Sequence, residues 1–262
     1  MLIRGEWFMD ISVASAALLF LAGAAAGLVG YIAGLASLIS YPALLALGLN
    51  PLAANATNTL AQVGASAGAT LRAGRQVGQA GAARTLEQVV IAAIGGAAGG
   101  ALLVTTGERA FEALAPWLIL FASLLILAAP LLWRFTSGAG TQKTSGWVVY
   151  LMVLIPVCVY GGYFGAGSGV VFLAATLLLG SQEYRQTMLM KTVLLGVSNL
   201  TASMVFVFFA PIDWFAVLVM FAGQTVGGTL GPGVQRHGPN NLSRWLIAAG
   251  GVFLAWWVWH RG

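Results

Sequence analysis

The sequence predicts an all-α polytopic membrane protein built from two inverted repeats. Each repeat is expected to contain a glycine-broken helical hairpin followed by three transmembrane helices. Three observations lead to this fold class: an extremely apolar composition, a series of apolar runs of membrane-spanning length, and a glycine interruption that recurs at matching places in the two halves of the chain.

The composition establishes the broad class. Hydrophobic residues make up 59% of the 262 residues and charged residues only 7%, whereas a soluble domain carries about 25% charged residues. The net charge of +5 comes from residues in short loops between apolar runs, where basic side chains orient a protein in the bilayer. Nucleic-acid binding is therefore not expected. Cys158 is the single cysteine, so neither a disulfide nor a metal site is implied.

The apolar runs form two sets of four. The leading run of each set, 11–48 or 147–180, is too long for one crossing, because a helix of that length would extend roughly 50 Å against a hydrocarbon core of about 30 Å. A turn in the middle would divide each into two short helices that form a hairpin. The first set covers roughly 11–48, 55–71, 87–106 and 113–133, and the second covers roughly 147–180, 189–209, 212–232 and 243–259.

The two leading runs also resemble each other in sequence. An offset of 132 positions superposes Gly30-Tyr31 on Gly162-Tyr163. Broken hydrophobic segments at corresponding places in two halves are the best sequence indication of a transporter binding site. The chain is thus expected to be one transporter domain over 1–262. Repeat 1 would cover about 11–135, a cytoplasmic linker 136–146, and repeat 2 about 147–260.

The basic residues predict the topology. With hairpins that return to their starting side, nine of the twelve lysines and arginines fall on the cytoplasmic side, which the positive-inside rule favours. A single crossing by each leading run would destroy this asymmetry. The protein is therefore expected to be a multi-pass cell inner membrane protein with both termini extracytoplasmic. The basic residues predicted inside are Arg72, Arg75, Arg84, Arg134, Lys143, Arg185, Lys191, Arg236 and Arg244.

Polar residues line one face of the helix that follows each hairpin. An offset of 133 positions superposes Thr59 on Thr192 and Ser66 on Asn199. Duplicated polar groups at membrane depth suggest a cavity wall, although interhelical hydrogen bonding is the alternative. The first face contains Asn55, Thr59, Gln62 and Ser66, and the second contains Thr192, Gly196, Asn199 and Ser203; the same offset places Asn58 on Lys191.

Lys191 and the glycine turns together suggest an anion site. Lys191 is expected to begin a long apolar helix, where a cation is unfavourable unless an anion lies nearby. Snorkelling to the surface, or pairing with Glu183, is the alternative. The turn around Gly167-Ser168 would direct free N–H groups of a helix start toward a ligand, and Gly34 marks the corresponding turn in the first half.

Several function classes are not supported. The acidic residues and both histidines lie in or beside loops or at span ends, so no proton relay of intramembrane carboxylates is indicated. No HExxH motif and no Ser-His-Asp set occurs at membrane depth. The protein is therefore not expected to be an enzyme, and no cofactor or metal is expected.

The sequence resembles the TauE/SafE sulfite exporter family over almost its whole length. The resemblance rests on the glycine-broken first segment, the run from Gly48 to Asn58, the second glycine turn followed by Lys191, Pro211-Ile212-Asp213-Trp214, and the late Gly227-Gly228. It implies an inner-membrane permease for sulfite, sulfonates or related anions.

The leading hypothesis is a secondary transporter that moves a small organosulfur anion or sulfite by alternating access. Its partners would be that anion and the lipid bilayer, with a homo-oligomer left open. The alternative is a non-transporting membrane scaffold or assembly factor whose glycine faces, 95–100 and 223–228, only pack against partners. The predicted substrate-binding residues are Gly34, Asn58, Thr59, Gln62, Ser66, Gly167, Ser168, Lys191, Thr192 and Asn199.

Overall fold

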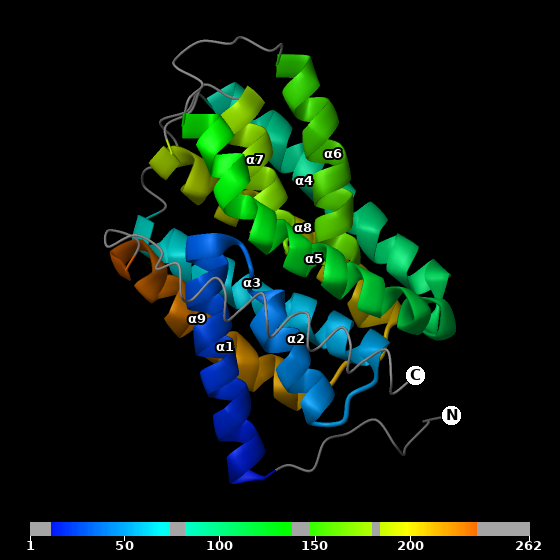
Figure 1. Ribbon diagram of the computed structural model, residues 1–262. Helices are drawn as coiled ribbons and strands as arrows, with labels where there is room; N and C mark the ends of the chain where they lie inside the picture. The colour runs from blue at the N-terminus through cyan, green and yellow to red at the C-terminus, as the bar shows by residue number, and fades with distance from the viewer. Residues whose placement is uncertain (1–11, 74–81, 138–146, 180–183, 235–262) are drawn as a thin grey trace.

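The computed structural model describes residues 12–73, 82–137, 147–179 and 184–234, and within these ranges the chain is α-helical with short connections and no strand (Figure 1). The all-α fold class is therefore confirmed. The helices are α1 (Val13–Ala33), α2 (Ser37–Ala46), α3 (Pro51–Ala73), α4 (Ala82–Thr106), α5 (Glu108–Ser137), α6 (Trp147–Tyr163), α7 (Ser168–Leu179), α8 (Tyr184–Phe209) and α9 (Trp214–Val234).

Both leading apolar runs are interrupted at the glycines. The first run divides into α1 and α2 at Gly34, whose φ of +75° is a backbone conformation that glycine adopts without strain. The second divides into α6 and α7 at a turn in which Gly165 and Gly167 both have φ of +78°. The expectation of two short helices is wrong for the first run. Its break falls late, so α1 has 21 residues, enough to span, and α2 only 10.

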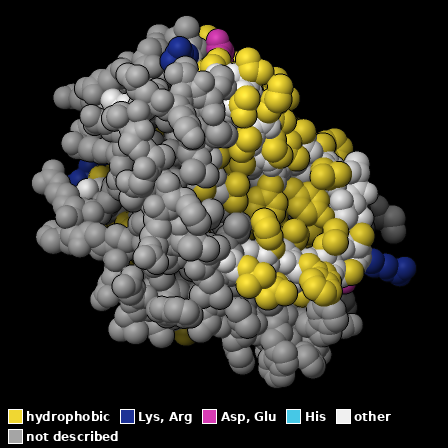
Figure 2. Space-filling view, turned by 45° about the horizontal axis from the view of Figure 1, so that its top comes forward, with side chains coloured by type: hydrophobic (Ala, Val, Ile, Leu, Met, Phe, Trp, Pro, Cys, Tyr) yellow, Lys and Arg dark blue, Asp and Glu magenta, His cyan; other side chains and the backbone are white. Residues whose placement is uncertain are grey.

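The helices and the surface fit a multi-pass membrane protein. In the described parts of the chain, four helices are long and apolar enough to cross a bilayer, namely α1, α4 from Arg84, α8 from Gln186, and α9. Large apolar side chains such as Leu21, Phe208 and Leu218 are more than 60% exposed. Figure 2 shows the described part of one face covered by hydrophobic side chains, with charged side chains at its margins. Such a surface would be unstable in water and is suited to lipid.

Helices α4 and α9 are exchanged between the two halves of the sequence. Helix α9 packs along α1 and α3, whereas α4 packs along α6 and α8 (Figure 1). The two groups meet where α3 contacts α8, and α5 touches both α3 and α7. Each half of the bundle is therefore completed by a helix from the other half of the sequence.

Glycine rows make these close contacts. Gly95 and Gly99 of α4 lie against Cys158 and Val159 of α6, where an added Cβ would overlap the neighbouring helix. Corresponding glycines of α9, Gly223 and Gly227, lie against α1, and Gly228 lies against Ala65 of α3. The two glycine runs are therefore helix-packing faces, as predicted, since small residues let transmembrane helices approach closely.

Most helices extend beyond the apolar runs that predicted them, because polar residues outside the hydrocarbon still cap and continue the helix. Asn50 caps α3: its Oδ1 accepts from the N–H of Ala53 at 2.6 Å, and its Nδ2 donates to Glu108 at 2.6 Å. Asp213 caps α9 by accepting from Ala216. Helix α5 continues two residues into the predicted 136–146 linker. The rest of that linker and the last predicted span, 243–259, lie outside the described residues.

Candidate functional site

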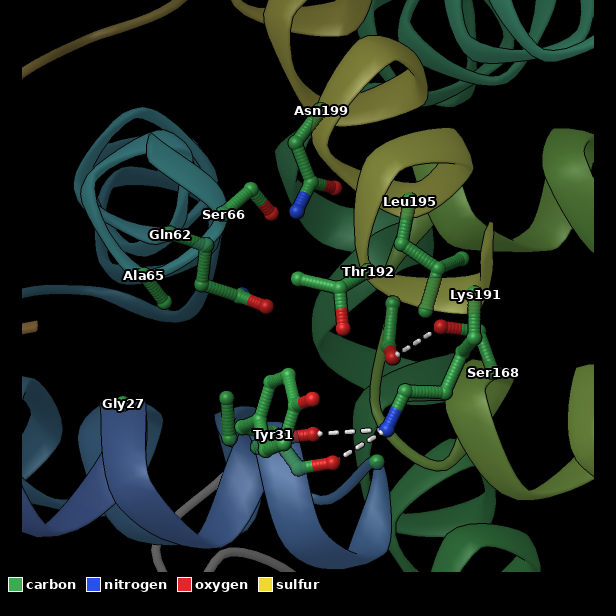
Figure 3. Close-up of a pocket in the computed structure, with 14 residues that line it drawn as sticks. Gly27, Tyr31, Gln62, Ala65, Ser66, Ser168, Lys191, Thr192, Leu195 and Asn199 are labelled. Atoms are coloured by element: carbon green, nitrogen blue, oxygen red, sulfur yellow. Dashed lines mark hydrogen bonds between the residues drawn. The ribbon is translucent and has the colours of Figure 1, made fainter. Parts of the chain in front are cut away.

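A small cavity lies where the two helix breaks meet the crossing of α3 and α8 (Figure 3). Its volume is about 40 Å³, enough for roughly three water molecules or one small ion. Its walls come from the end of α1, the α1–α2 turn, α3, the α6–α7 turn and α8. The lining residues are Gly27, Gly30, Tyr31, Gly34, Ala36, Gln62, Ala65, Ser66, Gly165, Ser168, Lys191, Thr192, Leu195 and Asn199.

Lys191 is the only charged side chain among the described residues that line this cavity. It is 1% exposed, and its Nζ donates to the carbonyl oxygens of Gly30 at 3.1 Å and Tyr31 at 2.6 Å. Nζ also lies 5.8 Å from the centre of the Tyr31 ring, within the range of a cation–π interaction. No carboxylate of the described residues is paired with it.

The expectation that Lys191 begins its helix is wrong. Helix α8 begins at Tyr184, because the polar residues before the apolar run are already helical. The ammonium group therefore does not oppose the positive end of α8. It lies instead at the carboxyl end of α1, where the helix dipole is negative and stabilises a cation. Burial also excludes snorkelling to the surface; Glu183, the other proposed partner, lies outside the described residues.

Polar side chains from α3 and α8 face the cavity from its two long walls. Ser66 and Asn199 line the cavity and point toward each other in Figure 3. Gln62 Nε2 donates to Ser37 Oγ at 2.9 Å, at the first residue of α2. Thr192 and Ser168 instead donate to nearby backbone carbonyls, those of Met188 and Gly165.

Seven of the ten predicted site residues line the cavity: Gly34, Gln62, Ser66, Ser168, Lys191, Thr192 and Asn199. The other three do not. Thr59 donates to the carbonyl of Asn55 within its own helix, Gly167 forms the turn behind Ser168, and the Asn58 side chain is buried elsewhere along α3.

Sequence reasoning missed the backbone on the α1 side of the cavity. The side-chain pattern does not show that the carbonyls of Gly30 and Tyr31 accept hydrogen bonds from Lys191. The one signal that could have indicated them is the repeated glycine–tyrosine pair, to which both residues belong. The other lining residues not predicted are Gly27, Ala36, Ala65, Gly165 and Leu195, which have no polar side chain to attract notice.

The described lining of the cavity is polar, with a single charged group. It contains one ammonium group, hydroxyls and amides, with no carboxylate or imidazole among the described lining residues. No group of three histidine, cysteine, aspartate or glutamate residues that could bind a metal occurs in the described parts of the chain. A positively charged, amide-rich, small cavity is suited to binding an anion.

Comparison with known proteins gives the family. The sequence model of the family described as "Sulfite exporter TauE/SafE" matches residues 19–257. The chain belongs to the TauE/SafE family. TauE/SafE proteins are membrane transporters and not enzymes. No solved structure was found to match the chain.

Individual TauE/SafE-like relatives agree. A "Probable membrane transporter protein" of Haemophilus influenzae is 33% identical over 85% of this chain and 86% of its own length. "Probable membrane transporter protein ORF9" of a Sinorhizobium species is 30% identical over 85% and 84%. "Probable membrane transporter protein YfcA" of Escherichia coli K12 is 26% identical over 81% and 78%.

Proposed function

We propose that this membrane transporter moves a small oxyanion, sulfite or a sulfonate, and binds it in the cavity beside Lys191. The observation that carries the proposal is a buried ammonium group with no carboxylate partner among the described residues, on the wall of a cavity at the centre of the bundle. A cation at membrane depth is costly without a partner and is a functional residue by default.

The ammonium group has hydrogen-bonding capacity left. It has three N–H donors, of which two are directed at Gly30 and Tyr31. The carbonyls orient the group and reduce its cost of burial, but they carry only partial charge. An anion in the cavity would supply the full counter-charge and accept the third hydrogen bond.

The starts of α2 and α7 add further donors. Ala36, immediately before α2, and Ser168, the first residue of α7, both lie on the cavity wall. The N–H groups of Ala36, Ser37 and Gly169 find no backbone acceptor among the described residues. Half-helices whose amino ends point at an anionic substrate are a recurring device of secondary transporters.

The size of the cavity favours a small anion. About 40 Å³ is space for an ion of a few heavy atoms such as sulfite. The sulfonate group of a larger compound would fit, with its organic part directed out of the site. The family description, which names sulfite export, supports the same substrate class.

We further propose alternating access between the two groups of helices, with α3 and α8 as their contact. The matching breaks and the exchanged α4 and α9 support two inverted repeats in one domain. The distribution of the basic residues supports an inner-membrane protein with both termini extracytoplasmic. The alternative scaffold function has no observation in its favour, because the described contacts of both glycine runs are made within this chain.

The decisive experiment is sulfite and sulfonate flux into proteoliposomes with wild type, Lys191→Met and Lys191→Arg. A charge-assisted hydrogen bond contributes about 1.5–3 kcal/mol, so Lys191→Met should lower the apparent affinity about 10- to 150-fold, and Lys191→Arg should retain part of it. Arg109→Gln, which removes an exposed cation, is the matched control.

Thermal denaturation of the purified variants separates folding from binding. Wild-type protein should be stabilised by sulfite, and folded Lys191→Met should not. Wild-type flux or stabilisation that survives unchanged in Lys191→Met would exclude Lys191 from the site. A wild-type protein that neither transports nor is stabilised by any of these anions would favour the scaffold.

A further inference from the structure

The two repeated glycine–tyrosine pairs end two corresponding helices, but different side chains meet those ends. At the end of α1, the carbonyl of Tyr31 accepts from the Lys191 ammonium group. At the end of α6, the carbonyl of Tyr163 accepts from Asn55 Nδ2 at 2.8 Å. Under the offset that superposes Thr59 on Thr192, Lys191 corresponds to Asn58. The carbonyl end of α6 therefore meets a neutral amide, that of Asn55, where the carbonyl end of α1 meets an ammonium group.

Asn58 and Asn55 are buried with polar atoms that have no partner. Both residues are 0% exposed. Neither Oδ1 nor Nδ2 of Asn58 makes a hydrogen bond, and Oδ1 of Asn55 is also unpaired, as is the hydroxyl of Tyr163. Buried polar groups in folded proteins are almost always satisfied, so each unpaired one calls for a partner such as an ion or a water molecule.

Asn58 lies on the same face of α3 as Asn55, which contacts the end of α6. Asn55, Asn58 and Gln62 are spaced i, i+3 and i+7, so they share one face of the helix. Asn55 on this face contacts the end of α6, and Gln62 contacts Ser37 at the start of α2. Asn58 lies between these two contacts along the same face of α3.

The donor set selects the class of ligand. Amide and carbonyl oxygens at the negative end of a helix are suited to a cation, and half-helix carboxyl ends coordinate sodium in other secondary transporters. Divalent magnesium and calcium prefer carboxylates, of which none pairs with these described residues. Asparagine does not titrate, so this position cannot carry a proton.

We propose that Asn55, Asn58 and the carbonyl end of α6 form a site for an alkali cation, sodium in the first instance, which is coupled to anion transport. This rests on the proposed function. The arrangement then places a fixed ammonium group at one helix end and an exchangeable cation at the corresponding one. The cation offsets the negative charge that the anion brings into a low-dielectric site.

Sodium-induced stabilisation tests the site directly. The melting temperature of the purified full-length protein is measured without anion in sodium chloride, potassium chloride and choline chloride at equal ionic strength. Sodium should raise it in a saturable manner, and Asn58→Leu should abolish the response while remaining folded, since an apolar side chain of similar size replaces an unpaired amide. Asn58→Ala is the second variant if Asn58→Leu does not fold. Ser203→Ala, which removes another buried unpaired group on α8, should keep the response.

Flux measurements test the coupling. Sulfite flux in proteoliposomes should be several-fold higher in sodium than in choline, and Asn58→Leu should lose this dependence. Identical melting temperatures in sodium and choline, or a sodium response retained by folded Asn58→Leu and Asn58→Ala, would overturn the proposal and assign these amides to bound water. Failure of the proposed anion site can be distinguished from failure of the sodium site. If only the anion site is wrong, Lys191→Met leaves sulfite flux unchanged while the sodium-induced stabilisation persists.

Discussion

Gly34 and Gly169 are in direct backbone contact, so the two helix breaks meet at one point in the bundle. A Cβ atom on Gly34 would lie 2.6 Å from the carbonyl carbon of Gly169 and 2.7 Å from its Cα, and a Cβ on Gly169 would lie 2.5 Å from the Cα of Gly34. Real Cβ atoms do not approach backbone so closely. This contact places the carboxyl end of α1 and the start of α7 beside the cavity. It is possible because neither residue has a side chain.

Gly34→Ala should therefore destabilise the protein more than its backbone conformation alone requires. Gly107 is a matched control: both glycines follow a helix, both have φ of +75°, and nothing lies within 4 Å of a Cβ at Gly107. Alanine in the left-handed conformation costs about 1–2 kcal/mol at either position. The overlap with Gly169 should add about 1–3 kcal/mol at Gly34 only. Thermal denaturation in detergent measures the difference. Equal losses at the two positions would show that the breaks do not meet.

Asn199→Ala should weaken anion binding without unfolding the protein. The amide lies on the cavity wall opposite Ser66, so its loss should raise the apparent dissociation constant for sulfite by about 10- to 150-fold, as expected for a hydrogen bond of about 1.5–3 kcal/mol to a charged group. Ser203 lies one turn further along the same stripe, buried but not on the cavity, and Ser203→Ala should leave affinity unchanged. Equal effects of both substitutions would mean that the stripe only joins helices.

Cysteine labelling tests the orientation. Arg84 is exposed near the start of α4, and Arg109 is exposed in the first turn of α5, just beyond the other end of α4, whereas the native Cys158 is buried. A membrane-impermeant maleimide should label Arg109→Cys in intact cells and Arg84→Cys only after permeabilisation. Phe209→Cys, at the end of α8, should behave like Arg109→Cys. Labelling of Arg84→Cys alone in intact cells would reverse the proposed orientation, and labelling of both arginine positions from one side would exclude α4 as a membrane span.

Much of the fold could be predicted, because it depends on local properties of the sequence. Hydrophobic length predicted the spans that became α3, α4, α5, α8 and α9, and glycine predicted where the leading runs break. The errors arose because the same local properties do not define where a helix begins. Apolar content marks where a helix enters lipid but not where its backbone begins, and for this reason Lys191 was placed at a helix start that lies at Tyr184.

The candidate site was only partly predictable. Polar residues on one face of a membrane helix need a polar environment, and this requirement identified Gln62, Ser66 and Asn199 as cavity residues. What each residue meets could not be read from spacing. Thr59 shares the stripe yet donates to its own helix, and Lys191 meets carbonyls that no side-chain pattern identifies.

The sequence by itself determined that the chain is a membrane protein, roughly where its helices lie and where two of them break, because hydrophobicity and glycine act through neighbouring residues. Only the tertiary structure decided that α4 packs against α6 and α8, that α9 packs against α1 and α3, and that Lys191 lies at the end of α1. Glycine faces fit many apolar partners equally well. The choice among those partners is a property of the whole bundle, in which each buried polar group must find its partner across helices that are distant in the chain.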